Sequence, residues 1–186
     1  MKEKKGNRKI SHLGIVENGK IYSLKGDHKE ALRHYREGLR MCTIENASEV
    51  FFQHYTQCVM ESLELSGGHD EVISYCEKTN ALLENNIERS DFIKKNYAVT
   101  VEKEAIQYLF KEDKQTATDL FKKVQTTIGR GNQPLTDELL NWLQRGYAIS
   151  EKQIRLAQKK HNYFTVRKEN INPEIAIELP KMVLPI

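Results

Sequence analysis

The segment from Glu17 to Met41, ENGKIYSLKGDHKEALRHYREGLRM, decides the fold of this chain. In each half its small and aromatic residues recur every three or four positions, which places them on one face of each of two helices. Between the halves, Gly26 can take the positive φ that ends one helix, and Asp27 can cap the next. The segment therefore predicts two helices joined by a tight turn.

This pattern resembles the tetratricopeptide repeat, in which small residues stand where two helices cross and aromatic residues fill the space between them. A weaker second copy covers residues 51–83, with Gly67 at the turn, and a third covers residues 98–128, with Glu112 there. The turn positions 26, 67 and 112 are 41 and 45 residues apart, against a family period of about 34 residues. Longer helices or loops are therefore expected. The residues that carry the first and third copies are Gly19, Tyr22, Gly26, Ala31, Tyr35, Gly38, Ala105, Tyr108, Ala117 and Phe121.

The resemblance implies an all-α, right-handed solenoid of about three antiparallel helix hairpins within residues 10–165. A further helix pair is expected over residues 136–162, where Ser150 and Gln153 make a capping-box pattern. This pair would cap the end of the solenoid. Residues 1–9 are expected to form a basic flexible tail, and residues 166–186 an extended arm.

The arm differs from the rest of the chain because it contains Pro173, Pro180 and Pro185, which exclude a long helix. Apolar residues alternate there as in a strand, and they are too many for a tail in water. We expect the arm to dock, either on its own solenoid or on another subunit as a route to a homo-oligomer. The expected docking residues are Ile175, Ile177, Leu179, Met182 and Leu184.

The family's concave groove, lined by the first helix of each hairpin, implies a set of partner-binding positions here. Only Lys20 among them is basic, so the family's clamp for a C-terminal carboxylate is not expected, and an extended peptide or a helix suits the groove better. The positions are Leu13, Val16, Lys20, His54, Gln57, Glu61, Val99, Glu102 and Ile106.

No catalytic constellation is visible in the sequence. His54 and Cys58 are neighbours on a predicted helix, but nothing supplies the third group that an activated nucleophile needs. The histidines and three cysteines lack the close spacing of a zinc site, and no glycine-rich phosphate loop follows a strand. We therefore expect no catalytic residues, no metal, no cofactor and no enzymatic activity.

Charge and hydropathy narrow the class of partner. The net charge of +3 is small, and the basic stretches at residues 1–9 and 145–168 are more typical of solvated surface than of a nucleic-acid site. No run of about eighteen apolar residues predicts a membrane span, and the unpaired cysteines suit a cytoplasmic protein. We expect an adaptor or scaffold subunit of a multi-protein assembly. The alternatives are a cytoplasmic chaperone for a secreted or assembling client and a peptide-sensing regulator or nucleic-acid-associated protein.

Overall fold

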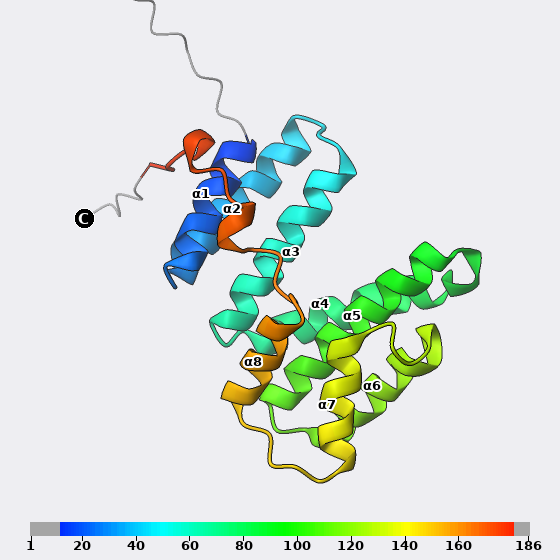
Figure 1. The fold of residues 1–186 in the computed structure, drawn as a ribbon. Coiled ribbons are helices and arrows are strands. Elements are labelled where there is room, and N and C mark those ends of the chain that lie inside the picture. The colour runs from blue at the N-terminus through cyan, green and yellow to red at the C-terminus, as the bar shows by residue number, and fades with distance from the viewer. Residues whose placement is uncertain (1–11, 181–186) are drawn as a thin grey trace, which may run out of the picture. The chain divides into compact units, whose positions relative to one another are not determined.

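The computed structural model describes residues 12–180, which fold into eight α-helices and three short 3-10 helices (Figure 1). Within this range the protein is all-α, as the sequence predicts. The chain divides into two compact units, with boundaries between Ser66 and Gly67 and between Phe164 and Thr165.

Unit 1 contains three long helices and the last described segment of the chain. Its elements are α1 (His12–Leu24), α2 (His28–Ile44), α3 (Glu49–Leu65), η2 (Lys168–Asn170) and η3 (Pro173–Ile175). Unit 2 contains the other five long helices. Its elements are α4 (His69–Glu84), η1 (Ile87–Arg89), α5 (Asp91–Phe110), α6 (Lys114–Ile128), α7 (Pro134–Gln144) and α8 (Glu151–Lys160).

The first predicted hairpin is confirmed as α1 and α2. Gly26 has a φ of 80°, and the Asp27 side chain accepts a hydrogen bond from the Glu30 amide, so the turn and the cap form as expected. A Cβ on Gly19 would lie 2.7 Å from the Tyr35 ring, so the small residue permits the close crossing. Helix α3 packs against α2, which completes the core of unit 1.

The helices of the second predicted hairpin both form, as α3 and α4, but they belong to different units. Within unit 2, helix α4 packs against α5. The hairpin predicted over residues 51–83 therefore spans the boundary between the two units.

The third predicted hairpin forms as α5 and α6, with Ala105, Ala117 and Phe121 fully buried between them. Helix α7 packs against α6, and α8 packs against α7. The capping box predicted at Ser150 and Gln153 is present at the start of α8.

Glu112 occupies the turn position of the third hairpin with a φ of 62°, a conformation that disfavours residues with a Cβ. We expect Glu112→Gly to raise the free energy of unfolding by about 0.5–1 kcal/mol, since relief of the strain exceeds the entropy that glycine adds to the unfolded chain. Gly26→Ala is the control in the opposite direction. A Cβ at this position would contact no other atom, so the substitution should destabilise the protein through backbone strain only. Urea unfolding of both variants measures the effect, and destabilisation by Glu112→Gly would contradict it.

Candidate functional site: the arm face of unit 1

Thr165 and the described part of the predicted arm, residues 166–180, lie against α1 and extend to α2 and α3 (Figure 1). The name arm refers to residues 165–180 from here on. Helix α1 is buried around its whole circumference, because Gly14 to Lys20 are all buried without a break. One side of α1 faces α2, and another side contacts the arm. The face that α1, α2 and α3 present to these residues is called the arm face.

Glu61 of α3 holds the beginning of the arm. Its side chain is 2% exposed, and one carboxylate oxygen accepts a hydrogen bond from the Thr165 amide at 2.6 Å. The other oxygen accepts one from the Val166 amide at 2.9 Å. A buried carboxylate with two backbone donors is a strong anchor, because hydrogen bonds to a charged acceptor are stronger than neutral ones.

Glu17 of α1 holds the middle of the arm. One of its carboxylate oxygens accepts a hydrogen bond from the Asn172 amide at 2.7 Å. The other is 2.6 Å from the Lys20 ammonium, and both side chains are almost fully buried. Lys20 therefore balances the charge of the carboxylate that binds the arm.

Gly14 allows the arm to approach the backbone of α1. The Gly14 carbonyl accepts a hydrogen bond from the Ile177 amide at 2.9 Å. A Cβ on Gly14 would lie 2.5 Å from the Ile175 carbonyl oxygen and 2.7 Å from the Ile177 side chain. Only glycine fits this position while the arm is bound.

Glu178 fixes the end of the arm through its side chain. One carboxylate oxygen accepts hydrogen bonds from the Asn18 amide at 2.7 Å and from the Tyr22 hydroxyl at 2.9 Å. The other oxygen lies 3.4 Å from Nε2 of His34 and 3.7 Å from the Arg33 guanidinium. The acid of the arm thus meets four polar side chains from two helices.

His34 and Arg33 also bind the backbone of the arm. Nδ1 of the fully buried His34 is 2.8 Å from the Glu30 carbonyl, so this nitrogen carries the proton, and Nε2 accepts from the Leu179 amide at 3.3 Å. Arg33 donates to the Pro180 carbonyl at 3.1 Å and to the Leu179 carbonyl at 3.4 Å. Most polar contacts on the arm face are therefore made to backbone atoms.

The arm is not the strand that the apolar alternation suggests. Residues 168–170 and 173–175 form 3-10 helices, and no ladder pairs the arm with another strand in the part of the chain that the structure describes. Proline is accepted at the first position of a helical turn because its missing N–H has no partner there in any case. Ile175, Ile177 and Leu179 lie in this docked segment, whereas Met182 and Leu184 lie outside the described residues.

The Glu178 carboxyl links docking of the arm to pH. Partial burial raises its pKa, but hydrogen bonds from Asn18 and Tyr22 and the positive charge of Arg33 outweigh this, so the net pKa is lowered. A lowered pKa in the docked state means that docking is strongest above the ordinary glutamate pKa and weakens as pH falls through the docked value.

We therefore expect the amide signals of Ile177 and Leu179 to shift toward their free positions as the pH falls from about 5 to about 3. Glu178→Gln should remove most of this dependence, because the amide does not titrate. Two-dimensional NMR of the full chain measures the shift at the arm itself. An unchanged titration in the variant would contradict the assignment.

Glu30, His34 and Glu178 bring three possible ligand atoms within 4.8 Å of one another. These atoms already accept hydrogen bonds or ion pairs, since Arg33 binds Glu30 at 2.8 Å and lies between the two carboxylates. A guanidinium at this point repels a cation. The cluster is therefore suited to holding the arm and not to coordinating a metal ion.

The groove residues expected in unit 1 take different positions. Val16 and Lys20 are buried inside it, Glu61 binds the arm, and Leu13, His54 and Gln57 remain partly exposed. Cys58 lies 4.0 Å from His54, but burial raises the pKa of its thiol to about 12 and lowers the pKa of the imidazole. This pair lacks the thiolate of an activated cysteine.

In unit 2, Glu102 and Ile106 of α5 are buried. Glu102 accepts hydrogen bonds from the Thr136 amide at 3.0 Å and from the Gln133 side chain at 2.7 Å, so it caps the start of α7. Burial raises the pKa of Glu102, against the opposing effect of these hydrogen bonds. Val99 is 44% exposed and lines a groove of about 570 Å³ together with Asp91, Lys94, Lys95, Thr127, Ile128, Asn132 and Gln133.

Sequence reasoning missed most of the residues that hold the arm, namely Gly14, Glu17, Asn18, Arg33 and His34. One signal was available. Gly14 is a glycine inside a helical pattern, where it costs about 1 kcal/mol of helix stability relative to alanine. Such a glycine often marks a point where another segment packs closely on the helix backbone.

Comparisons with protein-family models, with curated proteins and with solved structures found no match for this chain. Among residues 12–180, no helix is both long and apolar enough to cross a membrane.

Proposed function

We propose that this protein is an adaptor that binds extended segments of other proteins on the arm face of unit 1. In its own structure the arm is the resident occupant of that face. The tetratricopeptide-like solenoid expected from the sequence belongs to the same proposal, with the arm face as part of its binding groove. No catalytic step is part of the proposed function.

The observation that carries this proposal is that the arm face binds backbone atoms. Glu61, Glu17, the Gly14 carbonyl and His34 accept hydrogen bonds from five amides of the arm, and Arg33 donates to two carbonyls. Every protein segment offers such groups, so the face can accept other sequences in the same conformation. Side-chain selection then rests on an acid at the position of Glu178.

A competition experiment on the full chain tests the proposal. The probe is a labelled synthetic peptide of residues 165–180, TVRKENINPEIAIELP. In the unchanged chain the tethered arm competes at an effective concentration of about millimolar, so the peptide should bind weakly. Ile177→Pro removes the amide that donates to Gly14 and loosens the tethered arm while leaving the arm face intact. Binding of the unchanged peptide should then strengthen by about tenfold or more.

Two controls separate the arm face from other surfaces. Adding Gly14→Ala to Ile177→Pro places a Cβ where the bound backbone must lie, so it should abolish the gain. A peptide that itself carries Ile177→Pro should bind neither the unchanged chain nor the Ile177→Pro chain. Equal peptide binding by the unchanged chain and both variants would overturn the proposal.

A further inference from the structure

A second groove runs along α2 beside the arm face, with which it shares Arg33. Its volume is about 560 Å³, and it is lined by Lys29, Glu30, Arg33, Arg36, Glu37, Arg40, Leu179 and Pro180. Six of these residues belong to α2, and the last two belong to the docked arm. The groove therefore has one basic helical wall and one apolar wall supplied by the arm.

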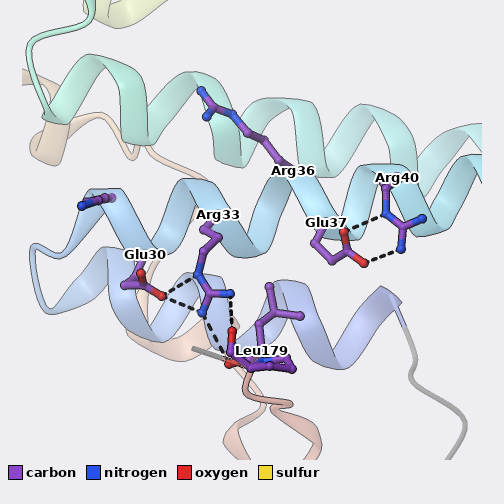
Figure 2. A pocket seen from close by; sticks show the side chains of 8 residues that line it. Glu30, Arg33, Arg36, Glu37, Arg40 and Leu179 are labelled. Carbon is purple, nitrogen blue, oxygen red and sulfur yellow. Dashed lines mark hydrogen bonds and ion pairs between the residues drawn. The ribbon is translucent and has the colours of Figure 1, made fainter. Parts of the chain in front are cut away.

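Four basic side chains line the groove, and two of them form ion pairs with neighbouring acids. Arg33 pairs with Glu30, and Arg40 makes two hydrogen bonds to Glu37, at 2.6 and 2.8 Å. Figure 2 shows both pairs and places Leu179 beside Arg33. The charges of these four residues therefore balance within each pair.

Lys29 and Arg36 are exposed, and within residues 12–180 no ion pair joins either of them to an acid. They are seven positions apart, so they lie on the same face of α2 about 10.5 Å from each other along the helix axis. In Figure 2 Arg36 points away from Leu179. The groove thus has a rim with two unneutralised positive charges opposite an apolar wall.

We propose that this groove binds an acidic, proline-rich segment of a partner protein in the polyproline II conformation. Such a segment has three residues per turn and rises about 3.1 Å per residue, so acids three positions apart share one face about 9.3 Å apart. That spacing matches Lys29 and Arg36. The remaining two faces present proline rings to Leu179, Pro180 and the aliphatic stems of the arginines.

The proposal goes beyond the binding of extended segments on the arm face, because it concerns a neighbouring groove that the docked arm itself helps to form and a different ligand. It rests on the arm being docked, since Leu179 and Pro180 form one wall. It does not depend on whether another segment can replace the arm.

The test uses the full chain and a labelled synthetic peptide, EPPEPPEPP, at low salt. We expect binding that weakens as salt is added and falls at least about tenfold in the double variant Lys29→Glu with Arg36→Glu, the change given by about 1.4 kcal/mol. The double variant should instead bind KPPKPPKPP. A matched control reverses Lys152 and Lys159 of α8, which are also exposed and seven positions apart, and should leave the affinity unchanged.

A peptide of the same composition with its acids adjacent, PPPEEEPPP, tests the spacing and should bind the unchanged chain at least about fivefold more weakly. Circular dichroism of each variant checks that the helices remain, and Lys29→Gln with Arg36→Gln replaces the charge reversal if they do not. No binding of EPPEPPEPP, equal binding of the two acidic peptides, or an equal loss in the α8 control would each overturn the proposal. None of these results bears on the competition experiment at the arm face.

Discussion

Glu61→Ala should release the beginning of the arm from α3. The substitution removes both acceptors of the Thr165 and Val166 amides and leaves a buried N–H without a partner. Each lost hydrogen bond to a charged group is worth about 1.5–3 kcal/mol, so the docked state should lose about 3 kcal/mol or more unless the arm detaches into water. Detachment is the expected outcome, because it lets both amides bind solvent.

Hydrogen exchange of the Val166 amide measures this directly, and we expect it to accelerate by about 100-fold or more, the factor that corresponds to about 3 kcal/mol. Glu61→Gln keeps the shape and one acceptor, so its effect should be intermediate. Glu49→Ala on the same helix is the control for charge, since Glu49 is exposed and its loss costs only about 0.5 kcal/mol. Unchanged protection of Val166 in Glu61→Ala would refute the role of this carboxylate.

Gly38→Ala should destabilise unit 1 although alanine favours helix. A Cβ at this position would lie 2.3 Å from Cγ2 of Val16, which is fully buried at the crossing of α1 and α2. Overpacking of this kind costs about 1–3 kcal/mol, whereas the gain in helix propensity is at most about 1 kcal/mol. We expect a net loss of about 1–2 kcal/mol in the free energy of unfolding.

Val16→Ala should offset part of the effect of Gly38→Ala, because it removes the methyl group that the new Cβ meets. Alone, Val16→Ala should cost about 2 kcal/mol through lost burial. The double variant should then be more stable than the sum of the two single effects by at least about 1 kcal/mol. Strict additivity in urea unfolding would show that the two side chains do not meet.

The sequence allowed the helices and their turns to be predicted because those features depend on neighbouring residues. Gly26 and Asp27 act on the backbone beside them, and the same holds for the capping box at Ser150. Even Glu112, the wrong residue type for its turn, was placed correctly by register alone, since it takes the positive φ that glycine takes at Gly26 and Gly67. Local geometry needs no knowledge of the rest of the chain.

The arm face could not be predicted in the same way, because its contacts join residues that are far apart in the sequence. Glu61 and Val166 are separated by 105 positions, Glu17 and Asn172 by 155, and Asn18 and Glu178 by 160. Glutamate in an amphipathic helix is usually solvated, so neither Glu17 nor Glu61 indicated by residue type alone that it is buried against backbone amides. The resemblance to a repeat placed Glu61 in a groove, and the arm was expected to dock, but no local pattern indicated that Glu61 would be the residue that binds it.

By itself, then, the sequence determined the all-helical class, the positions of the turns and the residues at the α1–α2 and α5–α6 crossings. The tertiary structure decided that α3 and α4 belong to different units and that the arm binds α1, α2 and α3. The physical reason is range. Propensity, capping and apolar spacing act within a few residues, whereas the site of a backbone-bound arm depends on which buried acceptors the folded helices leave without a partner.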